Sequence, residues 1–339
     1  MAKHMTVMAT WLVSVLEQLV AQGIDRHELT DGLWRMDTAQ GIPTRQLELT
    51  MVRRLWHRAA ALSGDPLLGL KVGATLPFQA MNIIAILVMH SANLREAIGH
   101  TVRCQQLVSN SGQLTARTQR GGMLLQYAVT PCPVAMHHTQ IESLFAGWLN
   151  LVRHCSALPR LHPHTVALTS PHAALEGAYA AHFGCPVACG AHRAALDFDD
   201  DTLDAPFHGA DPSLLALARD HAGAMLRAQN QADSLTASIR ASIAARGFTS
   251  VSCDVVALEL GVSIRTLQRR LTDSKTSFRR LLEETRMDEA MRLLCSTKQP
   301  LSALSDQLGY SEPSAFAHAV KAYWGETPRE LRNGSALVA

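Results

Sequence analysis

The chain has 339 residues, 47% of them hydrophobic, and a formal net charge of +2. This size favours two globular domains. The longest apolar window, residues 81–89, is much shorter than the roughly 20 residues that span a bilayer, and the N-terminus lacks a basic-then-apolar leader, so we expect a cytoplasmic protein without membrane contact. The seven cysteines are scattered and odd in number, which is typical of reduced thiols rather than of a disulfide framework.

The first third of the chain predicts helices. Residues 10–23 place apolar side chains three and four positions apart, and the pattern ends at Gly23. Residues 47–62 repeat this pattern, and residues 93–110 predict a third helix with Asn93 as its N-cap. We expect the apolar stripe of the first helix to consist of Leu12, Val15, Leu16, Leu19 and Val20.

Short strands are predicted after these helices. Residues 113–130 read as a hairpin that turns at a Gly-Gly pair, and residues 164–170 and 193–200 are short β-type runs. Residues 136–158 predict a helix between the hairpin and these short strands. The adjacent His137 and His138 would lie at its start, with their side chains on different faces. Helices followed by a small sheet with an inserted helix indicate an α+β domain over residues 1–207.

A linker helix is predicted next, over residues 208–231. Asp211 is placed to cap it, and Pro212 occupies its first turn, where a missing N–H costs little. Its apolar stripe is expected to be Leu214, Ala218, His221 and Met225. The stripe could pack on its own domain or serve self-association.

Residues 254–273 predict a helix-turn-helix unit. Asp254 is expected to cap a short helix that turns Val255, Val256 and Leu258 inward. A glycine at 261 permits a sharp turn, and Ser263 then caps a second helix. Ile264, Leu267 and Leu271 fall on the inner side of that helix, and Arg265, Gln268, Arg269 and Thr272 fall on the outer side.

The outer side suits DNA, because arginine donates to guanine and glutamine pairs with adenine in the major groove. Residues 261–282 also hold six basic side chains against one acidic side chain, Asp273. Such a patch is typical of a phosphate contact. On charge alone, a solvated helix face remains an alternative.

Residues 300–323 repeat the unit. Leu301 and Leu304 would face inward, a glycine makes the turn, and Ser311 heads a second helix with Pro313 in its first turn. The inner stripe would be Phe316, Val320 and Tyr323, and the outer side Ser314, Ala317, His318 and Lys321. About 20 residues between the units would form a helix of roughly 30 Å, which suits two recognition helices in successive major grooves, ~34 Å apart.

These segments resemble the C-terminal DNA-binding domain of the AraC/XylS transcriptional regulators. The resemblance is carried by "VVALELGVSIRTLQRRL", "SFRRLLEETRMDEAMRLL" and "LSALSDQLGYSEPSAFAHAVKAYWGETPREL". It implies an all-α domain over residues 232–339 with two helix-turn-helix units joined by a long helix. The closing TPRE also predicts a capping box between Thr327 and Glu330.

The phrases "GIDRHEL", "LSGDPLLGLKVG", "NLREAI" and "HFGCPVACG" resemble, more loosely, the effector-binding domain of AraC-type regulators. The resemblance implies a transcription regulator, an activator, that binds double-stranded promoter DNA and a small-molecule effector. RNA polymerase is an implied partner, and a homodimer is an open alternative. The resemblance identifies neither the effector nor the residues that would bind the effector.

The resemblance, together with the outer helix faces, assigns base-reading candidates to Arg265, Thr266, Gln268, Arg269, Ser314, Ala317, His318 and Lys321. Candidate contacts to the DNA backbone are Ser263, Arg270, Lys275, Arg279, Arg280 and Ser311. His318 stands where the family often has an arginine, and Val320 where a phenylalanine is usual. Because a neutral imidazole has no fixed charge, the second unit is expected to contribute less sequence discrimination than the first.

Two other classes of function are weaker alternatives. Residues 182–192 hold four side chains able to bind a metal: His182, Cys185, Cys189 and His192. Their C-x3-C spacing differs from that of structural zinc sites, so buried thiols are expected, with a redox- or metal-responsive regulator as the alternative. No phrase joins a nucleophile to a base and no glycine-rich phosphate loop occurs, so neither a catalytic residue nor a cofactor is predicted. An enzyme with a DNA-binding tail is the remaining alternative.

Overall fold

The computed structural model describes residues 6–31, 33, 46–132, 134–158, 160–274, 276–324 and 327–335. Lys275, a candidate DNA-backbone contact, lies outside the described residues. The chain divides into two compact units, one ending at Leu226 and the other beginning at Arg227, within helix α10 (Pro212–Arg246). Over the ranges described, no helix is long and apolar enough to cross a membrane.

The N-terminal unit is built on a five-stranded mixed sheet in the order β3-β4-β7-β5-β6. The predicted hairpin is confirmed, since β3 and β4 pair from Gly112↔Val129 to Gln119↔Gly122. β7 inserts between β4 and β5, antiparallel to both, and only the β5–β6 pair is parallel. The strands are β3 (Gly112–Gln119), β4 (Gly122–Val129), β5 (Thr165–Ala167), β6 (Val187–Ala188) and β7 (Ala194–Asp199).

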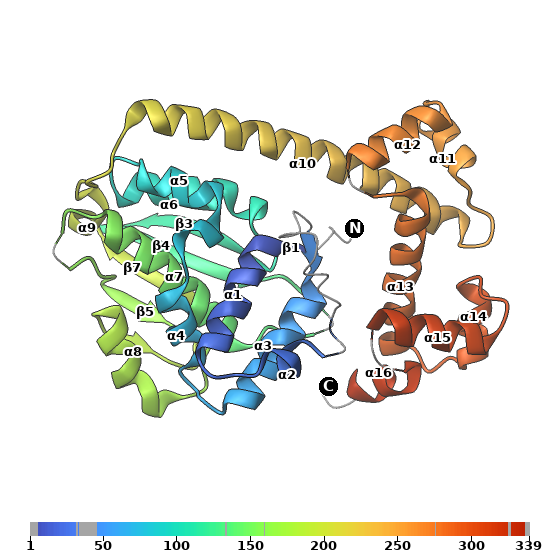
Figure 1. The fold of residues 1–339 in the computed structure, drawn as a ribbon, viewed down its shortest axis with the longest axis horizontal. Coiled ribbons are helices and arrows are strands. Elements are labelled where there is room, and N and C mark those ends of the chain that lie inside the picture. Colours follow the sequence, from blue (N-terminus) through green and yellow to red (C-terminus); the bar gives the residue numbers. More distant parts are fainter. Residues whose placement is uncertain are drawn as a thin grey trace. The chain divides into compact units, whose positions relative to one another are not determined.

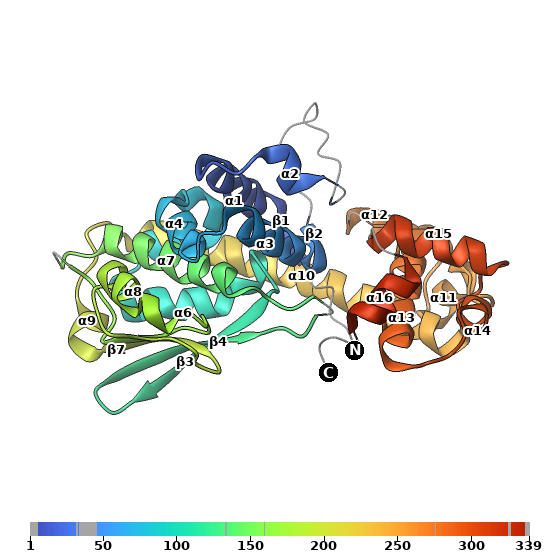
Figure 2. The same ribbon diagram turned by 90° about the horizontal axis from the view of Figure 1, so that it is seen from below.

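Helices cover one face of this sheet. Figure 2 shows α6 (Leu94–Cys104) and α8 (Glu176–Phe183) next to the strands, with α7 (His138–Cys155) beyond them. Most of α7 is buried because helices pack on its outer side as well. The short elements of this layer are α4 (Leu68–Thr75), η2 (Phe78–Met81), α5 (Ile83–Met89), η3 (Gln105–Leu107), η4 (Ala173–Leu175) and α9 (Asp200–Asp204).

A second core lies at the start of the chain, formed by α1 (Ala9–Ala21), α2 (Arg26–Thr30), α3 (Leu49–Ser63) and α4. The predicted helix from residue 47 starts two residues later, because β2 (Gln46–Glu48) pairs with β1 (Thr6–Met8). Val20, placed in the stripe of α1, is 37% exposed, and Trp11 is buried in its stead. The predicted cap of α6 is confirmed, since Asn93 Oδ1 accepts from Glu96 N at 3.0 Å.

Helix α10 begins as predicted, with Asp211 Oδ1 accepting hydrogen bonds from the first turn at 2.9 and 3.0 Å. The predicted stripe is half right, since Ala218 is buried and Met225 packs partly buried against the core. Leu214 and His221 are exposed, whereas Leu215, Ala218 and Ala222 are buried in the core of the N-terminal unit. Apolar side chains occupy both sides of this first half, so periodicity alone does not identify the buried side.

The C-terminal unit is all helical and has two small cores joined by α13 (Phe278–Ser296), which Figure 1 shows running between them. The first core contains the end of α10, α11 (Cys253–Glu259) and α12 (Ile264–Asp273). The second contains α14 (Leu301–Gln307), α15 (Pro313–Trp324) and α16 (Pro328–Ser335). The N-terminal α+β fold and the helical C-terminal region are therefore confirmed.

Several details of this unit differ from the prediction. Leu258 is 83% exposed, and Ala257 is buried in its place. Ser252 occupies the N-cap of α11, while Asp254 lies within its first turn. In α15 the third buried position is taken by Trp324, with Tyr323 only partly buried against the core.

The capping box of α16 is confirmed, since Glu330 Oε2 accepts from Thr327 N at 2.7 Å and Thr327 Oγ1 accepts from Glu330 N at 3.3 Å.

Candidate nucleic-acid interface and ligand pocket

The two predicted turns have the same backbone structure. In each, the glycine donates its N–H to the carbonyl three residues earlier at 3.1 Å, and the following residue donates to the carbonyl five residues earlier at 3.0 Å. Gly261 and Gly309 have φ of +65° and +76°, a region that favours glycine. The repeat in the sequence is therefore a repeat in the fold.

Helix α12 presents the predicted polar side to solvent. Its N-cap Ser263 Oγ accepts from Thr266 N at 3.1 Å, and the two hydroxyls hydrogen-bond to each other at 2.8 Å. Thr266 is thus part of the cap. Arg265, Gln268, Arg269 and Arg270 are exposed, whereas Leu267 and Leu271 are buried. Ile264, predicted to face inward, is 45% exposed.

Helix α15 presents a smaller and less basic side. Ser314, His318 and Lys321 are exposed, and Ala317 is partly buried beside them. Ser314 Oγ donates to Glu312 Oε2 at 2.9 Å, which places an acidic side chain at the start of the helix. Ser311 lies exposed two residues before the helix begins. Such a surface offers one fixed positive charge, from Lys321.

The other candidate contacts to the DNA backbone differ in their freedom. Arg279 is exposed, and the structure gives it no ion pair within the described ranges. Arg280 Nε lies 2.7 Å from Glu284 Oε1, and the buried Glu284 also contacts Arg240 Nη2 at 2.8 Å. Arg280 is therefore already paired within α13, and a phosphate would have to compete with Glu284.

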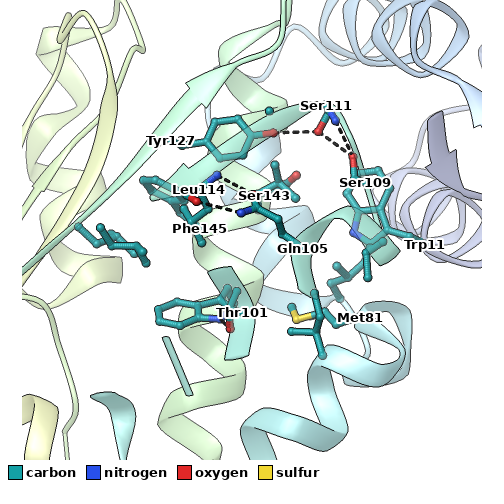
Figure 3. A pocket seen from close by; sticks show the side chains of 18 residues that line it. Trp11, Met81, Thr101, Gln105, Ser109, Ser111, Leu114, Tyr127, Ser143 and Phe145 are labelled. Carbon is teal, nitrogen blue, oxygen red and sulfur yellow. Dashed lines mark hydrogen bonds between the residues drawn. The ribbon is translucent and has the colours of Figure 1, made fainter. Parts of the chain in front are cut away.

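A cavity of about 770 Å³, including solvent space at its mouth, lies within the N-terminal unit (Figure 3). It is enclosed by the sheet and by α1, α5, α6 and α7. None of its 18 lining side chains carries a charge. They are Trp11, Leu76, Met81, Ile84, Thr101, Gln105, Val108, Ser109, Ser111, Gly112, Leu114, Leu125, Tyr127, Ser143, Leu144, Phe145, Trp148 and Leu196.

Three hydroxyls line one side of the cavity, opposite Met81 and Thr101 in Figure 3. Ser109 Oγ donates to Ser111 Oγ at 2.8 Å, and Ser111 Oγ lies 2.8 Å from Tyr127 Oη. Burial raises the pKa of Tyr127 to about 12, so its phenol remains protonated at neutral pH. These three hydroxyls are called the hydroxyl row below.

A buried cation lies behind the hydroxyl row. The Arg53 guanidinium, which is 1% exposed, donates to the carbonyls of Ser111, Thr130 and Val134 at 3.3, 2.6 and 2.7 Å. Burial lowers its pKa from the ordinary value. Among the described residues no acidic side chain pairs with Arg53, so its charge is compensated by carbonyl dipoles alone.

Residues 36–207, half of the chain, match the family of the arabinose-binding domain of AraC transcription regulators, and residues 256–334 match a helix-turn-helix domain family. The chain belongs to the AraC family of transcription regulators. The resemblance of both domains is thereby confirmed, and the protein is a DNA-binding regulator rather than an enzyme.

Relatives of this AraC-family regulator match it over nearly its full length. It is 25% identical over 320 residues to an ornithine utilization regulator of Pseudomonas aeruginosa, which covers 94% of each chain. It is 26% identical over 313 residues to VirS of Mycobacterium tuberculosis, covering 88% of this chain and 89% of that one. Among solved structures, the regulator CdpR from Pseudomonas aeruginosa is 20% identical and covers 91% of this chain and 97% of its own, with a TM-score of 0.43.

Residues 182–192 of the AraC-family regulator do not form a cluster of three metal-binding side chains. Across the part of the chain that the structure describes, no three His, Cys, Asp or Glu side chains are placed to hold a metal ion. Cys185 is buried, and burial raises its pKa to about 11. Cys189 is only partly buried, and burial raises its pKa as well. A protonated thiol is a poor nucleophile, so both cysteines fit a structural role.

Four histidines of the regulator meet at the start of α7, which the sequence did not predict. His137 is the N-cap, and its ring centroid lies 4.3 Å from that of His138 and 5.0 Å from that of His57. His172 lies 5.2 Å from His138, whose Nδ1 is 2.8 Å from Glu142 Oε1. The expected divergence of the two adjacent rings is wrong, because His137 is extended backbone before the helix. Burial, and then the neighbouring histidines, lower the pKa of His137 to about 4.

Proposed function

We propose that this regulator activates transcription, and that a small molecule bound in the N-terminal cavity controls its affinity for a promoter. The observation that carries the DNA-reading part is the pair of equivalent turns, each followed by a helix with an exposed polar side. Helix α13 has 19 residues and spans about 28 Å. This length supports placing the two recognition helices in successive major grooves, ~34 Å apart.

The two units are proposed to read DNA unequally. In α12, Arg265 and Arg269 would donate to guanine and Gln268 would pair with adenine. In α15, the contacts would come from Ser314, Ala317, His318 and Lys321. Because the second set carries one fixed charge and α12 carries three exposed arginines, most sequence discrimination is assigned to α12. Thr266 would act through the cap rather than by reading a base.

The DNA backbone would be contacted by exposed groups around both helices. These are Ser263, Arg270, Arg279 and Ser311, with Lys275 as a further candidate and Arg280 only in exchange for its pair with Glu284. Such contacts set register and salt dependence rather than sequence preference.

The effector is proposed to act through α10, which contributes to the cores of both units. Ala218 and Ala222 are buried in the N-terminal core, and Ile239 and Ile243 are buried in the core of the first helix-turn-helix unit. A ligand that favours one packing of the N-terminal unit would thereby bias the DNA-binding unit, as a coupling between two sites requires. RNA polymerase and a second copy of the chain are proposed partners.

The name of one relative refers to ornithine utilization, but the cavity gives no support for ornithine here. Ornithine carries two ammonium groups and a carboxylate, whereas none of the lining side chains is charged. Buried charges without partners are costly. We therefore propose a different effector for this chain.

The DNA-reading role is tested with Arg269→Ala. A preferred site is first selected from random double-stranded DNA with the wild-type protein, and binding to it is compared with binding to a scrambled duplex. We expect Arg269→Ala to weaken the free energy of binding to the selected site by at least ~1 kcal/mol, and to change binding to the scrambled duplex little. Arg329→Ala, an exposed arginine on α16, serves as the control. Equal losses on both duplexes would make Arg269 a phosphate contact.

A further inference from the structure

We infer that the effector is an uncharged, largely apolar molecule that carries a hydrogen-bond acceptor at one end. The inference rests on the proposed function of the cavity as the effector site, and it adds the chemical class of the ligand. It follows from three features: the lining of the cavity, the hydrogen-bond count of the hydroxyl row, and the buried guanidinium behind that row.

The lining favours an apolar body. Aromatic rings of Trp11, Phe145 and Trp148 and aliphatic side chains such as Ile84 and Leu125 form most of the wall. The volume of about 770 Å³ includes solvent space at the mouth, so it is an upper bound on the room for a ligand in the cavity. An ion transferred into it would lose its hydration without meeting a charged side chain, which is strongly unfavourable.

Most polar groups of the wall are already engaged by the protein. The Gln105 amide donates to the carbonyls of Leu114 and Val102, both at 2.8 Å, and its Oε1 accepts from Leu114 N. Thr101 Oγ1 accepts from Trp148 Nε1 at 3.1 Å, and Ser143 Oγ donates to a backbone carbonyl at 2.9 Å. These groups shape the cavity, and the hydroxyl row is left as its open polar group.

Counting protons in the hydroxyl row identifies what it offers a ligand. Three hydroxyls hold three O–H protons, and the two hydrogen bonds between them use two. Since Ser109 donates to Ser111, the spare proton lies on Ser111 or on Tyr127. Burying a donor without a partner costs about 1–3 kcal/mol. A carbonyl, ether or hydroxyl oxygen on the ligand would accept this proton.

Residue 112 allows the row to form. Gly112 lies opposite the Tyr127 ring, and a Cβ at this position would overlap the phenol. Any larger residue would push Tyr127 away from Ser111. The glycine thus serves the polar end of the cavity as well as the start of β3.

Arg53 sets the sign of charge that the polar end tolerates. Its guanidinium donates to Ser111 O, directly behind the row, so an ammonium group placed there would be repelled. A carboxylate would gain little in compensation, because Arg53 does not line the cavity and its donors point at backbone carbonyls. The polar end therefore suits a neutral acceptor.

The ligand class is tested with three ten-carbon probes on the full-length protein: decan-2-one, decanoate and decylammonium. Dissociation constants are measured by tryptophan fluorescence, since Trp11 and Trp148 line the cavity. We expect decan-2-one to bind at least tenfold more tightly than either charged probe. Tighter binding of decanoate or decylammonium would overturn the inferred class.

Two matched variants locate the binding. The triple variant Ser109→Ala, Ser111→Ala, Tyr127→Phe removes every proton of the row and is expected to weaken decan-2-one binding about tenfold, whereas Tyr127→Phe alone would leave a spare proton on Ser111. Ser143→Ala removes a hydroxyl from the same wall that is already bonded to the backbone, so it should change binding less than twofold. Equal effects of the two variants would contradict the role of the hydroxyl row.

A third variant separates the ligand class from the site itself. Leu114→Trp fills part of the cavity with an indole ring, at a partly buried position of the edge strand β3. Thermal unfolding checks that this variant folds. If a charged probe binds best and Leu114→Trp abolishes that binding, the cavity is the binding site but the inferred neutral class of ligand is wrong. If no probe binds, or if folded Leu114→Trp binds as the wild type does, the cavity fails as the effector site.

Discussion

Acidification is predicted to destabilise the N-terminal unit through His137. The charge of His137 would face His57 on α3, His138 on the same helix and His172 before η4, with Glu142 held by His138. In the unfolded chain this imidazole binds a proton near its ordinary pKa of 6.5, whereas in the folded chain it does so only near 4. Between these pH values the unfolded chain binds more protons, so stability is complete above pH 6.5 and falls as the pH falls.

The magnitude follows from the two pKa values. One pKa unit corresponds to about 1.4 kcal/mol, so lowering the pKa of His137 from 6.5 to about 4 corresponds to at most about 3.5 kcal/mol. The ring is partly exposed, and solvent screening reduces this to about 2 kcal/mol. A loss of that size is a large fraction of the stability of a typical domain.

The assay is urea unfolding of the full-length protein between pH 7.5 and 4.5, followed by tryptophan fluorescence. Four of the five tryptophans precede residue 227, so the signal reports mainly the N-terminal unit. His137→Asn keeps an N-cap acceptor and removes the titrating ring. We expect it to lose about 2 kcal/mol less on acidification than the wild type, whereas the exposed control His192→Asn should follow the wild type. Parallel curves for wild type and His137→Asn would refute the reasoning.

The glycines of the two turns give a second prediction. Gly261→Ala should lower the free energy of unfolding by roughly 1–2 kcal/mol, because its φ is positive. Gly309→Ala should lower it more, because the added Cβ would also lie 2.9 Å from Thr249 Cγ2. Thermal unfolding of both variants checks the order, and a larger loss for Gly261→Ala would contradict it. A third concerns α6: Asn93→Ala should cost about 1 kcal/mol and Asn93→Ser little, because serine also accepts from Glu96 N. Equal losses in urea unfolding would show that the side chain does not act as a cap.

The helix-turn-helix units could be predicted from the sequence because their signals are local. A glycine at positive φ and a serine N-cap act within a few residues of each other, and Gly261 with Ser263 confirm both. One boundary moved because a distant segment intervened, since residues 46–48 pair with residues 6–8 instead of joining α3. Helix α10 runs on to Arg246, beyond the predicted end at residue 231.

The errors in choosing the buried side of a helix have one physical origin. Leu258 on α11 and Leu214 on α10 are both exposed although their neighbours Ala257 and Leu215 are buried. A one-residue step turns a helix by about 100°, so a helix with apolar residues at adjacent positions fits two orientations equally well. The tertiary contacts, absent from a periodicity argument, decide between them.

The cavity could not be predicted because its wall is assembled from residues 11 to 196. Ser109 and Ser111 meet Tyr127 only through the register of the β3–β4 hairpin, in which Leu114 pairs with Tyr127. Leu196 joins the wall because β7 inserts next to β4. A DNA-reading helix keeps its contacts within a dozen residues, whereas this wall depends on the order of strands in the sheet. Changes in the lining can therefore alter the ligand while the turns of the DNA-binding unit stay the same, which is why family resemblance reaches the DNA-binding role but not the effector.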